Sequence, residues 1–136
     1  MPRRSIKREK LPGLIECYFQ VLEGKKPVEQ LEEVLSPHVQ FHDHQEHRLV
    51  GIDAVRDQIV GWRQSVRDPA VHMVRMTDHG DCVKVNFNVV CKVTVDDLHE
   101  AEVILPVIAM YEVEGGQITG IFEAWARVPP PARAYQ

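Results

Sequence analysis

The most informative stretch of this chain is GGQITGIFEAWA at residues 115–126. The two glycines predict a turn, and the apolar run behind them predicts the last strand of a hairpin. Side chains alternate along a strand, so Ile121, Glu123 and Trp125 should share one face. If that face is interior, burial raises the pKa of the Glu123 carboxyl toward values that suit a general acid or base. The alternative is an edge strand with Glu123 in water.

The segments before this stretch predict an α+β fold with three helices followed by a curled sheet. Three segments have apolar residues at helical spacing, and four have the alternation or the apolar content of strands. Consecutive hairpins between the last strands make that part of the sheet antiparallel. The expected helices span residues 11–22, 27–35 and 51–68, and the expected strands 39–43, 71–77, 82–95 and 100–113, with a polar loop at 44–50.

Length and composition indicate a single domain. A chain of 136 residues can bury one sizeable core. Residues 1–10 read as a basic flexible tail, 11–128 as the domain, and 129–136 as a proline-rich tail. The formal net charge of −4 argues against a nucleic-acid partner, and charges interrupt every apolar segment, which argues against a membrane span. Three cysteines without a C-x-x-C pair are typical of reduced thiols, so we expect a cytoplasmic protein.

Three stretches, taken in order and spacing, resemble the nuclear transport factor 2-like superfamily, which includes ketosteroid isomerases, limonene epoxide hydrolases and SnoaL-like polyketide cyclases. The stretches are VQFHD at 39–43, LVGIDAV at 49–55 and GQITGIFEAW at 116–125. The resemblance covers about residues 11–127 and makes 11–128 a SnoaL-like domain. It implies a cone-shaped, mostly antiparallel, cystatin-like sheet wrapped around the three helices. An apolar cavity inside the cone would be the default small-molecule site.

The resemblance also implies catalytic residues. Asp43 falls where ketosteroid isomerases hold their base, and Tyr18 falls near the tyrosine of their oxyanion hole. Glu123 matches the position of a catalytic aspartate in the epoxide hydrolases. Phe41 and Trp125 match aromatic lining positions. Ala109 stands where ketosteroid isomerases have a second oxyanion-hole acid, so steroid isomerisation by that arrangement is not expected.

Other side chains are expected to line the same cavity. The asparagines could orient water or a carbonyl, although they fit equally well as polar positions on a half-exposed sheet. The histidine of the strand 71–77 could line the cavity, but the alternative is a structural histidine whose hydrogen bonds are satisfied within the sheet. The arginine–aspartate pair of the epoxide hydrolases is absent from the long middle strand. The expected lining set is completed by Trp62, His72, Asn86, Asn88, Val107, Ala109 and Ile121.

A metal site is a weaker interpretation of the loop after the first strand. His42, His44 and His47 crowd this loop and could bind a metal. The sequence offers no second cluster of ligands, and a solvated, pH-sensitive loop is the simpler interpretation. We therefore predict neither a metal nor a cofactor.

Two carboxyls in one apolar cavity predict a small cofactor-independent enzyme. It would act by acid–base chemistry on an apolar, oxygen-bearing molecule, as an isomerase, dehydratase, cyclase or epoxide hydrolase. The alternatives are a non-catalytic ligand-binding or dimerisation module and a protein-interaction subunit. The outer sheet face is expected to be apolar and to form a homodimer. That face is predicted to carry Val85, Phe87, Val89, Ile104, Ile108 and Met110.

Overall fold

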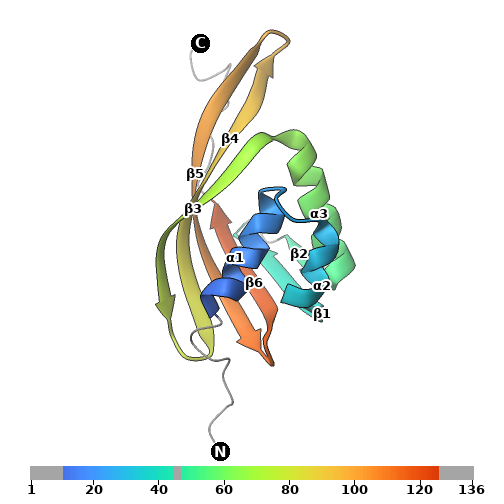
Figure 1. The fold of residues 1–136 in the computed structure, drawn as a ribbon, viewed down its shortest axis with the longest axis vertical. Coiled ribbons are helices and arrows are strands. Elements are labelled where there is room, and N and C mark those ends of the chain that lie inside the picture. The colour runs from blue at the N-terminus through green and yellow to red at the C-terminus, as the bar shows by residue number, and fades with distance from the viewer. Residues whose placement is uncertain (1–10, 45–46, 126–136) are drawn as a thin grey trace, which may run out of the picture.

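The computed structural model describes residues 11–44 and 47–125, so the two predicted tails lie outside the described residues. The described chain has the predicted α+β fold, in which helices pack against one six-stranded, mostly antiparallel sheet (Figure 1). The helices are α1 (Leu11–Leu22), the 3-10 helix η2 (Val28–Gln30), α2 (Leu31–Val34) and α3 (Ile52–Ser65). The strands are β1 (Leu35–Asp43), β2 (Arg48–Val50), β3 (Arg67–Asp78), β4 (Cys82–Asp96), β5 (His99–Glu114) and β6 (Gln117–Trp125).

The helices form where apolar residues recur at helical spacing. In α1 this spacing buries Ile15, Tyr18 and Leu22 on the side that faces the sheet. Gly24, whose φ of 79° favours glycine, follows α1 and ends it. In α3 the same spacing buries Val55 and Ile59. Together α1 and α3 cover the concave side of the sheet (Figure 1).

The strand that carries Glu123, β6, lies in the interior of the sheet. The strand order of the sheet is β2-β1-β6-β5-β4-β3, so β6 lies between β1 and β5. The edge-strand alternative for Glu123 is therefore wrong. The β1–β6 pairing is parallel, and it places Asp43 directly beside Glu123. On the other side of β6, Ala109 of β5 faces Glu123 in the antiparallel register.

The core lies between the helices and the inner face of β4, β5 and β6. Along β4 every second residue is buried, which places Val85, Phe87 and Val89 in the core. Their prediction on the outer face is therefore wrong. Ile104 and Ile108 are on the outer face as predicted, with exposed fractions of 62% and 47%. A strand has only two faces, so a one-residue error of register exchanges them completely.

Three local elements differ from the sequence-based prediction. The second helix is split into η2 and α2, and β1 then starts at Leu35 instead of residue 39. The ladder between β1 and β6 is irregular between Leu35 and Gln40, which accommodates Pro37 in the strand. Part of the predicted loop, Arg48–Val50, forms β2 against β1. Without β2, β1 would be the edge of the sheet.

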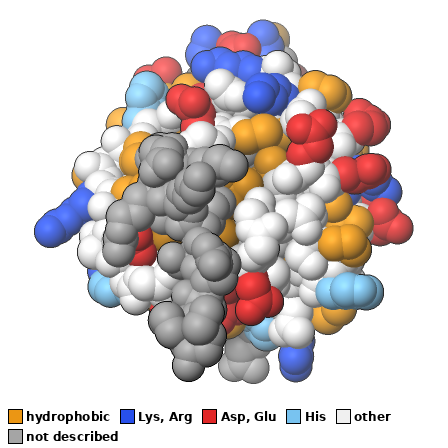
Figure 2. Space-filling model, turned by 60° about the horizontal axis from the view of Figure 1, so that its bottom comes forward, with side chains coloured by type: hydrophobic (Ala, Val, Ile, Leu, Met, Phe, Trp, Pro, Cys, Tyr) orange, Lys and Arg blue, Asp and Glu red, His pale blue; other side chains and the backbone are white. Residues whose placement is uncertain are grey.

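Neither a membrane-spanning helix nor a dominant charge is seen in the part of the chain that the structure describes and on the face shown. In the segments 11–44 and 47–125, no helix is both long and apolar enough to cross a bilayer. Acidic, basic and apolar side chains share the face shown in Figure 2. This mixture agrees with the modest net charge of −4.

Candidate functional site

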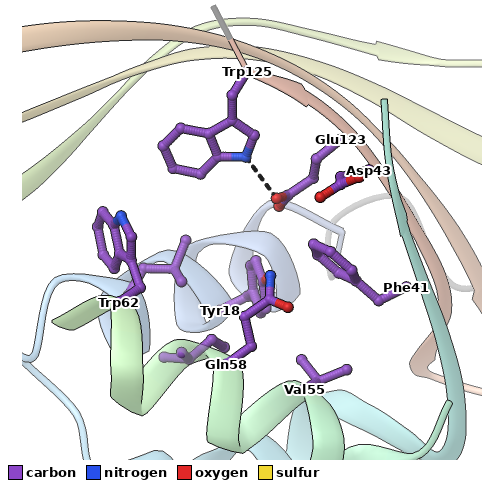
Figure 3. A pocket seen from close by; sticks show the side chains of 10 residues that line it. Tyr18, Phe41, Asp43, Val55, Gln58, Trp62, Glu123 and Trp125 are labelled. Atoms are coloured by element: carbon purple, nitrogen blue, oxygen red, sulfur yellow. Dashed lines mark hydrogen bonds between the residues drawn. The ribbon is translucent and has the colours of Figure 1, made fainter. Parts of the chain in front are cut away.

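The candidate site is a cavity of about 190 Å³ between α1, α3 and the ends of β1 and β6 (Figure 3). Six residues predicted from the sequence as site residues line it together. They come from four elements, with Tyr18 on α1, Phe41 and Asp43 on β1, Trp62 on α3, and Glu123 and Trp125 on β6. The volume lies below the roughly 300–1,000 Å³ that is usual for drug-sized ligands, so the site suits a smaller molecule.

Among the described residues, Glu123 is the only acidic or basic residue that is buried, with an exposed fraction of 6%. Its Oε1 accepts a hydrogen bond of 2.8 Å from the indole Nε1–H of Trp125. Burial raises the pKa of Glu123 from its ordinary value of 4.5 to about 7, the Trp125 hydrogen bond opposes that rise, and the Asp43 charge adds to it. Near neutral pH, Glu123 is therefore present in both its protonated and its charged form.

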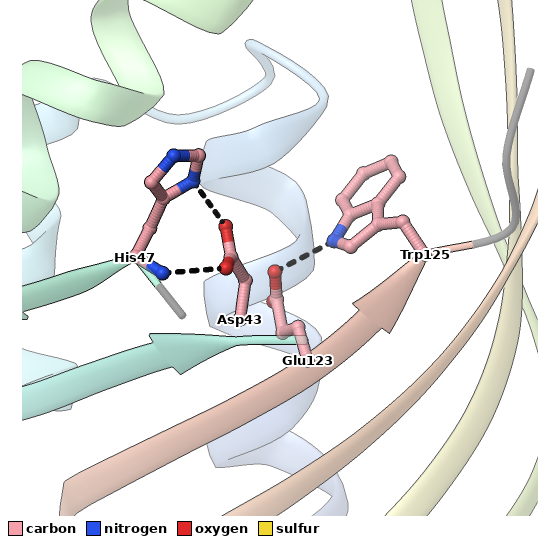
Figure 4. Close-up of polar contacts among 4 residues, drawn as sticks. All are labelled: Asp43, His47, Glu123 and Trp125. Carbon is pink, nitrogen blue, oxygen red and sulfur yellow. Dashed lines mark hydrogen bonds and ion pairs between the residues drawn. The ribbon is translucent and has the colours of Figure 1, made fainter. Parts of the chain in front are cut away.

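Asp43 lies beside Glu123 in the sheet and is held from the other side by His47 (Figure 4). Asp43 Oδ1 accepts the main-chain N–H of His47 at 2.9 Å, and Oδ2 contacts the ring Nδ1 of His47 at 2.8 Å. The side chain of Asp43 is 17% exposed, whereas that of His47 is 68% exposed. The two acids thus occupy different environments, which is the arrangement that separates the roles of paired carboxyls.

Two buried tyrosines lie near Glu123. Tyr18 lines the cavity, and burial, followed by the charge of Glu123, raises its pKa well above the ordinary value. Its hydroxyl therefore stays protonated and can donate a hydrogen bond to an oxygen in the cavity. The ring of Tyr111 meets that of Tyr18 edge-on, with centroids 5.8 Å apart. The Tyr111 hydroxyl is buried and has no hydrogen-bond partner among the described residues.

Helix α3 contributes lining residues that the sequence analysis did not assign to the site. Gln58 brings a polar side chain to the wall that faces the two acids (Figure 3). Its position between Val55 and Ile59 on one helical face is the signal that could have identified it. Trp62, which was predicted, packs against Trp125 with ring centroids 6.0 Å apart. The lining set is completed by Leu22, Val55 and Ile59.

The remaining predicted residues do not line this cavity. Ile121, Val107 and Ala109 are buried in the core beside it, with Val107 paired to Trp125 and Ala109 to Glu123. Asn86 and Asn88 are paired with Ile108 and Pro106, so they lie on the outer face, and His72 lies opposite Asn88 on the same face. Their assignment to the cavity is wrong because β4 turns its valines and Phe87 inward.

The histidines of the β1–β2 connection do not gather around a common point. Among the described residues, no group of three or more histidines, cysteines or acids is arranged to hold a metal ion. His42 stacks on Phe122 with ring centroids 4.9 Å apart, and Phe122 is exposed on the outer face. His47 instead contacts Asp43.

A family model described as the SnoaL-like domain matches residues 15–121. That range includes Tyr18, Phe41 and Asp43 and ends just before Glu123. A search of curated proteins found no match.

Several solved structures share the fold at low sequence identity. A candidate SnoaL-like polyketide cyclase from Jannaschia sp. CCS1 has a TM-score of 0.76 and 15% identity, with 92% of this chain and 91% of that chain covered. An epoxide hydrolase from M. tuberculosis, similar to limonene epoxide hydrolase, has a TM-score of 0.68, 15% identity, and coverages of 84% and 80%. A protein with a ketosteroid isomerase-like fold from Catenulispora acidiphila, solved in complex with trimethylamine, has a TM-score of 0.71, 12% identity, and coverages of 82% and 84%. At these identities, the likeness shows the fold alone.

Proposed function

Because the chain belongs to the SnoaL-like domain family within the nuclear transport factor 2-like superfamily, we propose that it is a small acid–base enzyme. Its substrate would be a small, apolar, oxygen-bearing molecule, and its reaction an isomerisation, a dehydration, a ring closure or an epoxide opening. The observation that carries the proposal is a buried carboxyl with a pKa of about 7 beside a second carboxyl in one largely apolar cavity. This chemistry needs no cofactor.

The two acids would divide the proton transfers between them. Asp43, which His47 contacts through both carboxylate oxygens, would act as the base and take a proton from substrate carbon or from water. Glu123 in its protonated form would give its proton to the substrate oxygen, and Tyr18 would donate a hydrogen bond to the same oxygen as charge develops. Proton exchange with solvent would then return both carboxyls to their starting forms.

The walls of the cavity support this chemistry because they are mostly apolar. Phe41, Trp62 and Trp125 give the cavity three aromatic walls, and Val55 and Ile59 add aliphatic ones. In such a site a proton donor acts more strongly than in water, because the effective dielectric is low. Gln58 would orient the polar end of the substrate from the opposite wall.

The test is turnover by the variants Asp43→Asn and Glu123→Gln on any substrate found by screening small ketones, epoxides and hydroxylated compounds. Each variant should lose about 10²- to 10⁴-fold in kcat, the usual contribution of one general acid or base. Glu114→Gln, which changes an exposed acid at the end of β5, is the matched control and should retain full activity. Undiminished turnover by both site variants would exclude the proposed mechanism.

A second candidate is the non-catalytic binding of a small cationic amine. The ten described lining residues include four aromatic side chains and two acids but no lysine, arginine or histidine. Aromatic faces and carboxylates both attract ammonium groups. The relative from Catenulispora acidiphila was crystallised with such an amine.

Calorimetric titration with tetramethylammonium, compared with neutral tert-butanol, separates the two candidates. The non-catalytic role would be favoured if the protein binds tetramethylammonium but not tert-butanol, loses that binding in Glu123→Gln, and turns over no compound in the screen. Equal or absent binding of both probes would remove this second candidate.

A further inference from the structure

His47 is the solvent-exposed end of a row of four neighbouring polar side chains. In Figure 4 the row begins at Trp125, continues through Glu123 and Asp43, and ends at His47. Trp125 is half-buried, and from Glu123 onward the exposed fraction rises, from 6% for Glu123 to 17% for the Asp43 side chain and 68% for that of His47. His47 therefore lies where the site meets water, whereas Glu123 is shielded from it.

The contact between His47 and Asp43 fixes the carboxylate at two points. The main-chain N–H of His47 reaches Oδ1, and the ring Nδ1 reaches Oδ2. A carboxylate only accepts hydrogen bonds, so the ring contact requires a proton on Nδ1. The main chain adds further ties, because Asp43 N donates to His47 O at 3.1 Å and His44 N donates to Glu123 O at 3.0 Å. The backbone around Asp43 is thus held independently of the imidazole.

We propose that His47 is a positioning residue that holds the Asp43 carboxylate ionised and beside Glu123, and so fixes which of the two acids is the base. This inference rests on the proposed function, in which Asp43 and Glu123 have opposite roles. The other described titratable groups around the pair are Tyr18 from α1 and Tyr111 from β5. Both tyrosines stay neutral, whereas the imidazole contacts Asp43 directly and so treats the two acids differently.

The indole of Trp125 provides a readout that needs no substrate. Its N–H donates to Glu123, so its NMR signal should shift when Glu123 changes protonation. The chain has two tryptophans, and Trp62→Phe leaves the Trp125 indole signal alone for assignment. The measured quantity is the pH midpoint of the Trp125 signal.

Removing the imidazole should lower this midpoint. In His47→Ala the Asp43 carboxylate keeps the main-chain bond at Oδ1 but loses the ring contact at Oδ2. Its Oδ2 can then rotate away from Glu123, which weakens the repulsion of a charged Glu123. The fall should be smaller than that in Asp43→Asn, where the charge is absent, and His47→Gln should restore part of the difference by offering an amide N–H. The main-chain bond to Oδ1 survives in both His47 variants, so both should fold.

His44→Ala is the matched control, since His44 is tied to Glu123 through its main-chain nitrogen, and it should leave the midpoint unchanged. A midpoint in His47→Ala that equals or exceeds that of the unchanged protein would overturn the role of His47, even if Asp43→Asn behaves as expected. An equal fall in His44→Ala would overturn it as well. A Trp125 signal that titrates near the ordinary range of a glutamate in every protein would remove the proposed function together with this inference.

Discussion

At the scale of single residues, Glu123 lowers the stability of the fold at high pH. Its pKa is raised in the folded state from 4.5 to about 7, so the folded protein favours the neutral carboxyl. The associated stability is fully present below pH 4.5 and is lost as the pH rises through about 7. At about 1.4 kcal/mol per pH unit, the difference amounts to roughly 3 kcal/mol.

Glu123→Gln should remove this pH dependence. The amide can still accept the hydrogen bond from Trp125 but does not ionise, so the variant should unfold at higher urea concentration than the unchanged protein at pH 8 and at a similar concentration at pH 4.5. Urea unfolding at the two pH values measures the effect, with Glu114→Gln as the exposed control. The measured quantity is the difference in stability between Glu123→Gln and the unchanged protein. If this difference is the same at pH 8 and at pH 4.5, Glu123 ionises normally.

The residue types were enough to predict part of this site, and the rest could not be predicted for physical reasons. The position of Glu123 between Ile121 and Trp125 was enough to predict an interior face. The asparagines were misplaced because a one-residue register error in β4 exchanges the two faces. The contact of His47 with Asp43 could not be predicted, because it depends on how the chain closes between β1 and β2.

At the scale of elements, the parallel pairing of β1 with β6 creates the pair of acids. This pairing joins residues 80 positions apart in the chain, Asp43 and Glu123. Periodicity does not reveal it, because consecutive strands are the default partners and a parallel pair between distant strands has no local signal. Helix α3 then completes the cavity, and its direction is set where the chain leaves β2 at Gly51.

Gly51 should therefore be sensitive to substitution. Its φ of 96° and ψ of 152° fall in a region that is essentially restricted to glycine, and its N–H donates to Val39 O at 2.8 Å. Gly51→Ala should cost about 1–3 kcal/mol from backbone strain alone, because the added methyl group would meet only Pro37 O at 3.9 Å.

Gly61→Ala is the matched control within the same helix. Nothing lies within 4 Å of an added methyl group there, so alanine should stabilise α3 by about 0.5–1 kcal/mol. Chemical unfolding of both variants measures the difference. A Gly51→Ala protein as stable as the unchanged one would contradict the proposed backbone constraint.

At the scale of the whole molecule, the outer face of the sheet remains apolar near its centre. Ile104, Ile108 and Phe122 expose 62%, 47% and 43% of their surface, and Met110 pairs with Phe122 across β5 and β6. The helices cover only the opposite face (Figure 1). We propose that a second copy of the chain covers this patch, as a symmetric pair would.

Sedimentation at several concentrations tests the proposed pair. The protein should sediment as a dimer, and Ile108→Glu should sediment as a monomer because it places a charge in the centre of the patch. Leu98→Glu is the control, since Leu98 is exposed at the tip of the β4–β5 hairpin, away from that centre. An unchanged protein that stays monomeric at all concentrations would contradict the pairing.

The proposed chemistry depends above all on the protonation of Glu123 beside Asp43. Carboxyl-resolved carbon NMR of the protein, followed from pH 4 to pH 9, measures it for Glu123 and for the Asp43→Asn variant. The midpoint for Glu123 should lie near 7 and should fall when the Asp43 charge is removed. A midpoint close to 4.5, unchanged in the variant, would contradict the proposed chemistry.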